Sequence, residues 1–233
     1  MLKRFALLLL TVVMVITGIG IPTAVAGQTK SVNPSRNPIP SNEPPKIANE
    51  TGVPFDFRLA PQFQETGFNA REWNRVRKLE TQDPVFDREI LHTEDAELAA
   101  EWKRLYNELS YASRETQIRH VNRLFNLWHY REDPANYRRD DYWASPREFI
   151  MYSGDCEDYA IIKYFALRAL GIPARDLCIV GLKTPAHAIL VVQDYDGFYV
   201  LDNNSDAIVA RNKALRLYVP DFYINEDGIW RHK

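Results

Sequence analysis

The stretch that decides the fold reads Ser153-Gly154-Asp155-Cys156-Glu157-Asp158-Tyr159. A glycine and a capping acid end one segment here and a long apolar run over 156–170 begins, so the stretch predicts a helix that starts at Cys156. The run is apolar on nearly every face, interrupted chiefly by Lys163 and Arg168, and Gly171 ends it. We therefore expect a buried, central helix with a thiol at its N-terminus.

A thiol at that position is a candidate nucleophile. The partial positive charge of a helix N-terminus stabilises a thiolate, the form of cysteine that attacks carbonyl carbon. Downstream, His187 opens an apolar segment and Asp202 closes the next one. Alone, each would pass for an ordinary strand-end or turn residue. Together with Cys156 they follow an order used by hydrolases and acyltransferases, with His187 as the base, Asp202 as its orienting group and the Cys156 N–H as an oxyanion donor.

The turn over 194–197 tests whether His187 and Asp202 can meet. A loop of two or four residues would place Gln193 opposite Phe198, with His187 and Asp202 on one face of the sheet as diagonal neighbours. Their backbones would then lie about 7–8 Å apart, within reach of an imidazole and a carboxylate. A three-residue loop would put the two side chains on opposite faces.

The remaining pattern predicts an α+β fold, with N-terminal helices packed on an antiparallel sheet. Capping residues predict helix starts at Asn69 (with Glu72 at the capping-box position), at Thr93-Glu94-Asp95, near Ser113 and at Ser145-Pro146-Arg147-Glu148, the last helix reaching about Tyr152. Two core faces recur at helical spacing: Leu98, Trp102, Leu105 and Leu109, and then Ile118, Val121, Leu124, Phe125 and Trp128. Strands are expected over 177–182, 187–193, 198–201, 215–219 and 222–224, with Asp-Gly turns at 196–197 and 227–228.

Three acids flank the expected nucleophile: Asp155, Glu157 and Asp158. Carboxylates this close should raise the pKa of the Cys156 thiol, because they disfavour a second negative charge. Helix capping explains one or two of them. Three oxygen donors in four residues would also suit Ca²⁺, a hard cation that would remove the electrostatic penalty. The sequence leaves both interpretations open.

The N-terminus indicates export. Lys3 and Arg4 precede an apolar run and a small-residue site ending at Ala26, the pattern of a signal peptide over 1–26. The alternative is an uncleaved anchor, but glycines and a proline interrupt the run short of the roughly 20 residues that a span needs. Residues 27–52 are rich in Pro, Asn and Ser, which predicts a disordered tether, and residues 53–233 form the expected domain. We expect no stable membrane insertion after cleavage.

Charge and cysteine content narrow the function further. The net charge is −2 and there is no block of basic residues, so nothing indicates nucleic-acid binding. The two cysteines are too few for a disulfide framework. Cys178 lies in an apolar segment and should be a small buried strand residue. The alternative, a Cys156–Cys178 disulfide, would silence the thiol.

These residues form a familiar set. The motif around Cys156, the stretch 141–148 before it, Lys163-Tyr164-Phe165, Leu170-Gly171-Ile172-Pro173, His187 and Val200-Leu201-Asp202-Asn203 together resemble the bacterial transglutaminase-like cysteine peptidases, most closely the exported LapG-type proteases. The similarity covers about 118–211. Residues 28–90 match nothing in the family pattern.

The resemblance implies a papain-like, transglutaminase-like fold with a triad of Cys156, His187 and Asp202. It also implies dependence on Ca²⁺ held by Asp155, Glu157 and Asp158, and a periplasmic role in which the protease cleaves large surface adhesins, releases biofilm cells and is sequestered by a cyclic-di-GMP-binding membrane receptor. Trp143 has two interpretations: its indole packs in the core, or its N–H is the second oxyanion donor, as in transglutaminase relatives.

Two rival functions remain. A transglutaminase-like acyltransferase would use the same residues and let an amine resolve the thioester, which the sequence cannot distinguish from hydrolysis. A non-catalytic peptide- or receptor-binding module on a decayed protease scaffold is the other, and the complete Cys-His-Asp set argues against it.

Overall fold

The computed structural model describes residues 67–88, 90–184, 186–195, 197–210 and 218–231. The predicted signal peptide and tether, residues 1–26 and 27–52, lie outside the described residues, so the domain boundaries stay predictions. Within the described part of the chain, no helix is both long and apolar enough to cross a membrane.

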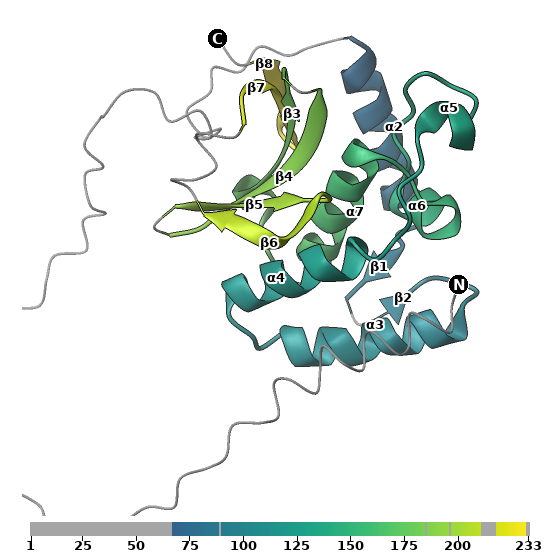
Figure 1. The fold of residues 1–233 in the computed structure, drawn as a ribbon. Helices are drawn as coiled ribbons and strands as arrows, with labels where there is room; N and C mark the ends of the chain where they lie inside the picture. Colours follow the sequence, from purple (N-terminus) through teal and green to yellow (C-terminus); the bar gives the residue numbers. More distant parts are fainter. Residues whose placement is uncertain (1–66, 89, 185, 196, 211–217, 232–233) are drawn as a thin grey trace, which may run out of the picture. The chain divides into compact units, whose positions relative to one another are not determined.

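Helices occupy the first half of the described chain and gather against one sheet (Figure 1). They are α2 (Phe68–Gln82), α3 (Ala96–Leu109), α4 (Arg114–Phe125), the short α5 (Asp133–Asn136), α6 (Pro146–Tyr152) and α7 (Cys156–Ala169). Asp95 caps α3 by accepting from Leu98 N–H at 3.0 Å, and Ser113 caps α4. Both starts confirm the sequence prediction.

The two helices nearest the nucleophile begin where the sequence predicts. Ser145 and Glu148 form the expected capping box of α6, which ends at Tyr152. α7 begins at Cys156, and the Asp158 carboxylate accepts the Asp155 N–H at 3.2 Å. α7 is buried along most of its length, as its apolar faces predict, and packs against α4, α6, β3 and β4.

The second half of the chain forms a six-stranded antiparallel sheet in the order β6-β5-β4-β3-β7-β8. Its strands are β3 (Leu177–Leu182), β4 (His187–Gln193), β5 (Phe198–Asp202), β6 (Ser205–Ala210), β7 (Pro220–Asn225) and β8 (Gly228–Arg231). β3 is buried throughout because it lies inside the sheet and beside α7. The fold is therefore α+β, as predicted.

The β4–β5 hairpin has the register that the candidate site requires. Its loop holds four residues, and Gln193 pairs with Phe198. Side chains alternate along a strand, so His187 shares its face with Ile189 and Val191, and Asp202 lies on that face as well. These apolar neighbours belong to a buried cluster that also contains Cys178, confirming its predicted place in the core.

Several local predictions are wrong. α2 begins at Phe68 with Gly67 as its N-cap, so Asn69 lies inside the helix and Glu72 bonds Arg75 at 3.1 Å instead of capping. α4 ends at Phe125, before Trp128. Of the strand expected over 215–219, residues 218 and 219 are not in a strand and the others lie outside the described residues. Helix α5, the 3₁₀ helix η1 (Ala174–Asp176) and the small β1–β2 hairpin (Phe86–Asp87 and Ile90–Leu91) were not predicted, because such short segments carry little periodicity. Strand β6 was not predicted either, because its sequence over 205–210 has no regular alternation.

Candidate active site

The chain makes a sharp bend just before the nucleophile helix. Ser153 has a φ of 68°, a left-handed value that non-glycine residues rarely adopt. Its N–H donates to Phe149 O at 2.8 Å and its hydroxyl donates to His129 O. At Gly154 a Cβ would lie 2.0 Å from an Asp158 carboxylate oxygen, so only glycine fits there. These contacts fix the direction in which α7 leaves the bend.

Cys156 lies at the first position of α7 and is partly buried. Its Sγ donates to Glu157 Oε2 at 3.2 Å, and the backbone N–H of Ala188, next to His187, hydrogen-bonds the sulfur. Burial raises the pKa of the thiol, and Glu157 and Asp155 raise it further. Cys156 and Cys178 are both free, so the disulfide alternative is wrong.

His187 and Asp202 meet as the hairpin register predicts. His187 Nε2 lies 2.9 Å from Asp202 Oδ1. Asp202 Oδ1 also accepts the Asn204 N–H at 2.9 Å, and Oδ2 accepts the Tyr218 hydroxyl at 2.8 Å. Although burial raises the pKa of Asp202, the bonds to His187, Asn204 and Tyr218 bring it below the usual value. The pair is thus an ionised carboxylate that holds the Nε2 atom of the imidazole.

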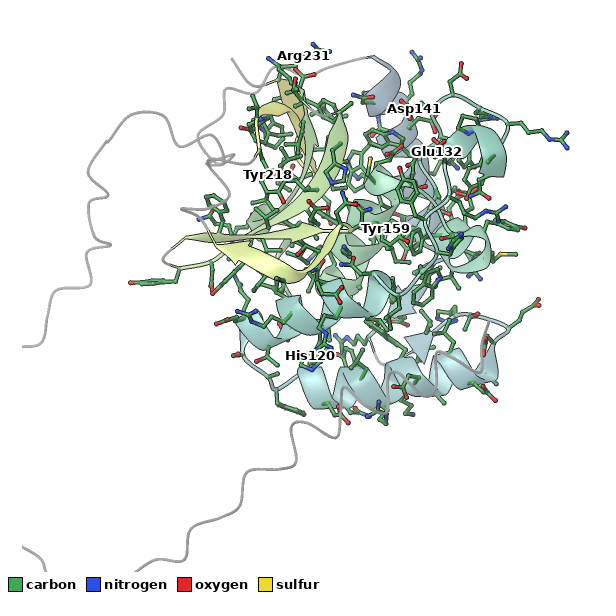
Figure 2. All side chains as sticks on the ribbon, in the orientation of Figure 1. His120, Glu132, Asp141, Tyr159, Tyr218 and Arg231 are labelled. Atoms are coloured by element: carbon green, nitrogen blue, oxygen red, sulfur yellow. The ribbon has the colours of Figure 1, made fainter. Side chains whose placement is uncertain are left out.

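Opposite this pair, five carboxylates surround the start of α7. We call this set the acid cluster: Asp133, Asp141, Asp155, Glu157 and Asp158. Their oxygens fall into groups of three within 4.8 Å of one another, and Asp155 and Glu157 form one such group with the Cys156 sulfur. Figure 2 shows Asp141 and Glu132 on the helical side of the molecule and Tyr218 on the sheet side.

The acids of the cluster destabilise one another's ionised forms. Burial and the neighbouring Asp155 raise the pKa of Asp133 to about 7. Burial and Asp155 raise the pKa of Glu157 to about 10, and the same two causes place the pKa of Asp158 well above its usual value. Several carboxylates sharing one buried space cannot all carry charge at neutral pH unless a cation joins them.

The donor set fits a hard cation. Asp133 Oδ1 and Asp155 Oδ1 are buried without a hydrogen-bond partner. Buried carboxylate oxygens are otherwise almost always satisfied, so these two have room for a further partner, either water or a cation. Asp158 differs, since its oxygens accept the N–H groups of Ala144 at 2.6 Å and Asp155 at 3.2 Å. An all-oxygen set of clustered carboxylates is the chemistry that Ca²⁺ prefers.

Sequence reasoning missed Asp133 and Asp141, because both lie outside the cysteine motif: Asp133 opens the short helix α5, and Asp141 lies in the loop before α6. The tertiary reason they join the cluster is a parallel bridge between Tyr130 and Gly154, closed by the Arg131 N–H to Gly154 O bond of 2.9 Å. This bridge holds the loop beside the start of α7. The only sequence signal was the density of acids over 132–141.

Trp143 is buried, with 3% of its surface exposed. Burial raises the pKa of Asp141, and a hydrogen bond from the Trp143 side chain opposes that rise. Trp143 O accepts from Arg75, whose guanidinium also lies 4.4 Å from the centre of the Tyr142 ring. The core interpretation agrees with this burial, and the oxyanion role stays a prediction.

The structure thus joins the predicted residues in two groups: His187 contacts Asp202, and Asp155 and Glu157 lie around the Cys156 sulfur. Among the described residues, no hydrogen bond joins the Cys156 sulfur to His187; the thiol donates to Glu157 instead. The catalytic roles therefore stay predictions, while the predicted proximity of His187 and Asp202 is confirmed.

Comparisons with known proteins agree with this geometry. Residues 80–232 match the family model described as "Bacterial transglutaminase-like cysteine proteinase BTLCP". The match is wider than the expected 118–211 and includes residues 80–90, which we expected to lie outside the family pattern. Calcium-bound LapG from Legionella pneumophila is 29% identical, with a TM-score of 0.51 over 69% of this chain and 90% of that one. EGTA-treated LapG from the same organism is also 29% identical, with a TM-score of 0.50 over 69% and 85% of the two chains. A comparison with curated proteins gave no match. The chain belongs to the bacterial transglutaminase-like cysteine proteinases.

Proposed function

We propose that this cysteine proteinase is an exported, calcium-dependent endopeptidase whose triad is Cys156, His187 and Asp202. The observation that carries the proposal is the 2.9 Å contact between His187 and Asp202 beside a helix-start thiol. The Ala188 N–H on the sulfur ties the start of β4 to the start of α7, so the base and the nucleophile come from adjoining strand and helix ends.

The residues divide the chemistry as follows. His187 Nδ1 takes the thiol proton, and the Cys156 sulfur attacks the scissile carbonyl carbon while the carbonyl oxygen becomes an oxyanion. The Cys156 N–H faces that oxyanion from the helix start. His187 then gives its proton to the leaving amine, and water releases the acyl group by the reverse sequence. Asp202 holds the Nε2 tautomer and stabilises the imidazolium throughout.

Calcium would be held by Asp155, Glu157 and Asp158, as the sequence suggests, together with Asp133 and Asp141. The two unpartnered oxygens of Asp133 and Asp155 support this assignment, as does the calcium-bound state of Legionella pneumophila LapG. A bound Ca²⁺ supplies positive charge that offsets these acids and lowers the pKa of the thiol. Glu157 would then no longer compete with His187 for the thiol proton.

The proposed site of action is the periplasm, because the N-terminus has the pattern of a signal peptide. The proposed substrate is an exported protein, such as the N-terminal region of a large surface adhesin. A cyclic-di-GMP-responsive membrane receptor is the proposed regulatory partner. Resemblance to LapG-type proteases motivates both assignments.

The test is direct cleavage. Purified protein is mixed with candidate surface adhesins, with and without a calcium chelator, and the products are separated by gel and identified by mass spectrometry. We expect discrete fragments with calcium and none with chelator. Adding a primary amine separates hydrolysis from acyl transfer, since amine incorporated at the cleaved carbonyl would indicate an acyltransferase. An intact substrate under all conditions would contradict the proposed specificity.

A further inference from the structure

Lys163 lies in the middle of α7, where a charged side chain is unexpected. Its side chain is among the largest that are fully buried, with 1% exposed. Within the described residues it forms no ion pair with a carboxylate. Instead, its Nζ donates to Asn122 Oδ1 at 2.9 Å and to Asn126 Oδ1 at 2.6 Å, and it lies 5.6 Å from the centre of the Tyr159 ring.

Asn122 lies in α4 and Asn126 is the C-cap of that helix. The amide nitrogens of both residues point toward the sheet. Asn122 Nδ2 donates to Ser205 O at 2.8 Å. Asn126 Nδ2 lies 3.0 Å from Asp202 O, 3.0 Å from Ser205 O and 3.1 Å from Asp206 Oδ1. The NH₂ groups of both asparagines therefore donate to residues at the β5–β6 turn. Asp202, the last residue of β5, lies directly before this turn.

The ammonium group decides which way these amides face. An ammonium is only a donor, so each asparagine must turn its oxygen toward Lys163. Each NH₂ group then points at the β5–β6 turn, where backbone carbonyl groups accept. Without the ammonium, nothing at that end of the amides would prefer oxygen over nitrogen. The lysine thus fixes the orientation of two asparagines that hold the turn.

The charge is not needed for packing. Burial lowers the pKa of Lys163 to about 7, and Asp202 and Asp206 oppose that shift. A buried charge costs more free energy than an apolar side chain of the same volume, so a methionine or leucine would fill this space at a lower cost. The two acids that favour the charged form both belong to the segment that the asparagines hold.

We propose that Lys163 is a positioning residue for the triad: through Asn122 and Asn126 it fixes the β5–β6 turn, and with it the Asp202 carboxylate that orients His187. The inference rests on the proposed function in assigning His187 and Asp202 to catalysis. It predicts that loss of the ammonium changes how His187 works without changing the contacts of the substrate.

The test substitutes Lys163→Met, which keeps an unbranched side chain as far as the ε-carbon and removes the ammonium group. Lys78→Met, at an exposed position of α2, is the matched control. We expect Lys163→Met to lower kcat by about tenfold with KM unchanged, at the lower end of what loss of a supporting hydrogen-bond partner costs. The control should retain the wild-type rate, and a Lys163→Met variant with wild-type kcat would overturn the proposal.

A double-mutant cycle shows whether the effect passes through Asp202. In an Asp202→Asn background, Lys163→Met should lower kcat by less than about twofold, because the carboxylate that it positions is already gone. A full tenfold loss in that background would contradict the proposed route. Asn126→Ala is the second variant; it breaks the same connection without altering the charge of α7, and it decides the question if Lys163→Met does not fold.

Two further readouts separate positioning from stability and do not need a peptide substrate. The pH profile of Cys156 alkylation should shift in Lys163→Met in the same direction as in Asp202→Asn. The ¹⁵N shifts of the His187 imidazole, assigned with His187→Ala, should show loss of the fixed Nε2–H tautomer. A lower Tm with both readouts unchanged would make Lys163 purely structural. If the wild type cleaves no peptide, the proposed function fails, while the imidazole spectrum still decides the role of Lys163.

Discussion

The two sides of Cys156 differ in how well their polar groups are satisfied. On the sheet side, the Asp202 carboxylate accepts from His187, Asn204 and Tyr218, and its pKa is lowered. On the helical side, the acid cluster contains two buried oxygens without partners, and all five of its acids have raised pKa values. The chain alone completes the first side, whereas the proposed calcium would complete the second.

This difference indicates which side of Cys156 could regulate the activity of the thiol. The hairpin preorganises the His187–Asp202 pair, so the free energy needed to orient the imidazole is supplied when the sheet folds. The acid cluster instead raises the pKa of the thiol, and Glu157 accepts the hydrogen bond of the thiol. Calcium binding would therefore be coupled to the availability of the nucleophile. The following experiments test this difference between the two sides of Cys156.

Removal of the nucleophile should have the largest effect. Cys156→Ala should abolish peptide hydrolysis, a loss of about 10⁶-fold in kcat, and leave folding nearly unchanged. Cys178→Ala is the matched control, since Cys178 is a buried strand residue outside the site. Fragment formation followed by gel, with Tm by calorimetry, checks both. Near-normal turnover by Cys156→Ala would contradict the proposed mechanism.

Damage to the sheet side should come next. His187→Ala should lower kcat by about 10³-fold or more, because the thiol loses its base and the leaving group its acid. Asp202→Asn should cost less, since the orienting group is one step removed from the substrate. Steady-state kinetics measure both, with the exposed His92→Ala as control. A mild loss in His187→Ala would mean that this histidine is structural.

The helical side should respond to calcium. Chelation should lower activity at least tenfold. If calcium at 100 times its Kd contributes about 2.7 kcal/mol, chelation should also lower Tm by about 5–10 °C. Added Ca²⁺ should restore the chelated wild type but not a variant in which Asp155 and Glu157 are both alanine. Activity that is equal with and without chelator would reduce these acids to helix caps.

The pH dependence of the chelated protein has a defined sign. The pKa of Asp133 rises from 3.8 to about 7 on folding, so the folded state binds more protons between those values. Stability is then full below about pH 4 and falls as pH rises through about 7. We expect a higher Tm at pH 5 than at pH 7 in chelator, and a smaller difference with calcium.

Between about pH 4 and pH 7, the acid cluster is separated from the groups whose titration makes stability rise with pH. The lowered pKa of Asp202 acts below this range, and the lowered pKa of Lys163 acts above about 7. Glu80, whose pKa burial raises to about 7, has the same sign as Asp133 but lies outside the cluster. A Glu80→Gln background therefore removes its share. A Tm that rises from pH 5 to pH 7 in that background would contradict the pKa of Asp133.

Trp143→Phe should have the smallest effect on turnover. The indole bonds Asp141, so we expect weaker calcium binding, by about tenfold, and a kcat at saturating calcium within about twofold of wild type. Calcium titrations of activity separate the two quantities. A fall of about 10²-fold in kcat at saturating calcium would instead assign the indole to the oxyanion.

Helices whose start and buried face are encoded by neighbouring residues could be predicted from the sequence alone. Capping residues and apolar periodicity located α3, α4, α6 and α7, because a helix start depends on side chains within one turn. The nucleophile and its three flanking acids are contiguous, so their proximity follows from covalent connection. The His187–Asp202 contact was also predictable, because a four-residue loop fixes the register of a hairpin.

The contacts between segments that are far apart in the sequence could be read only from the tertiary structure. Asp133 and Asp141 reach the acid cluster through the Tyr130–Gly154 bridge, a contact between segments more than twenty residues apart. The role of Lys163 depends on α4 lying between α7 and the β5–β6 turn. A periodic pattern states which face of a helix is buried, but not which partner covers it. The long-range packing of α4 and of the loop before α6 therefore had to be seen in the structure.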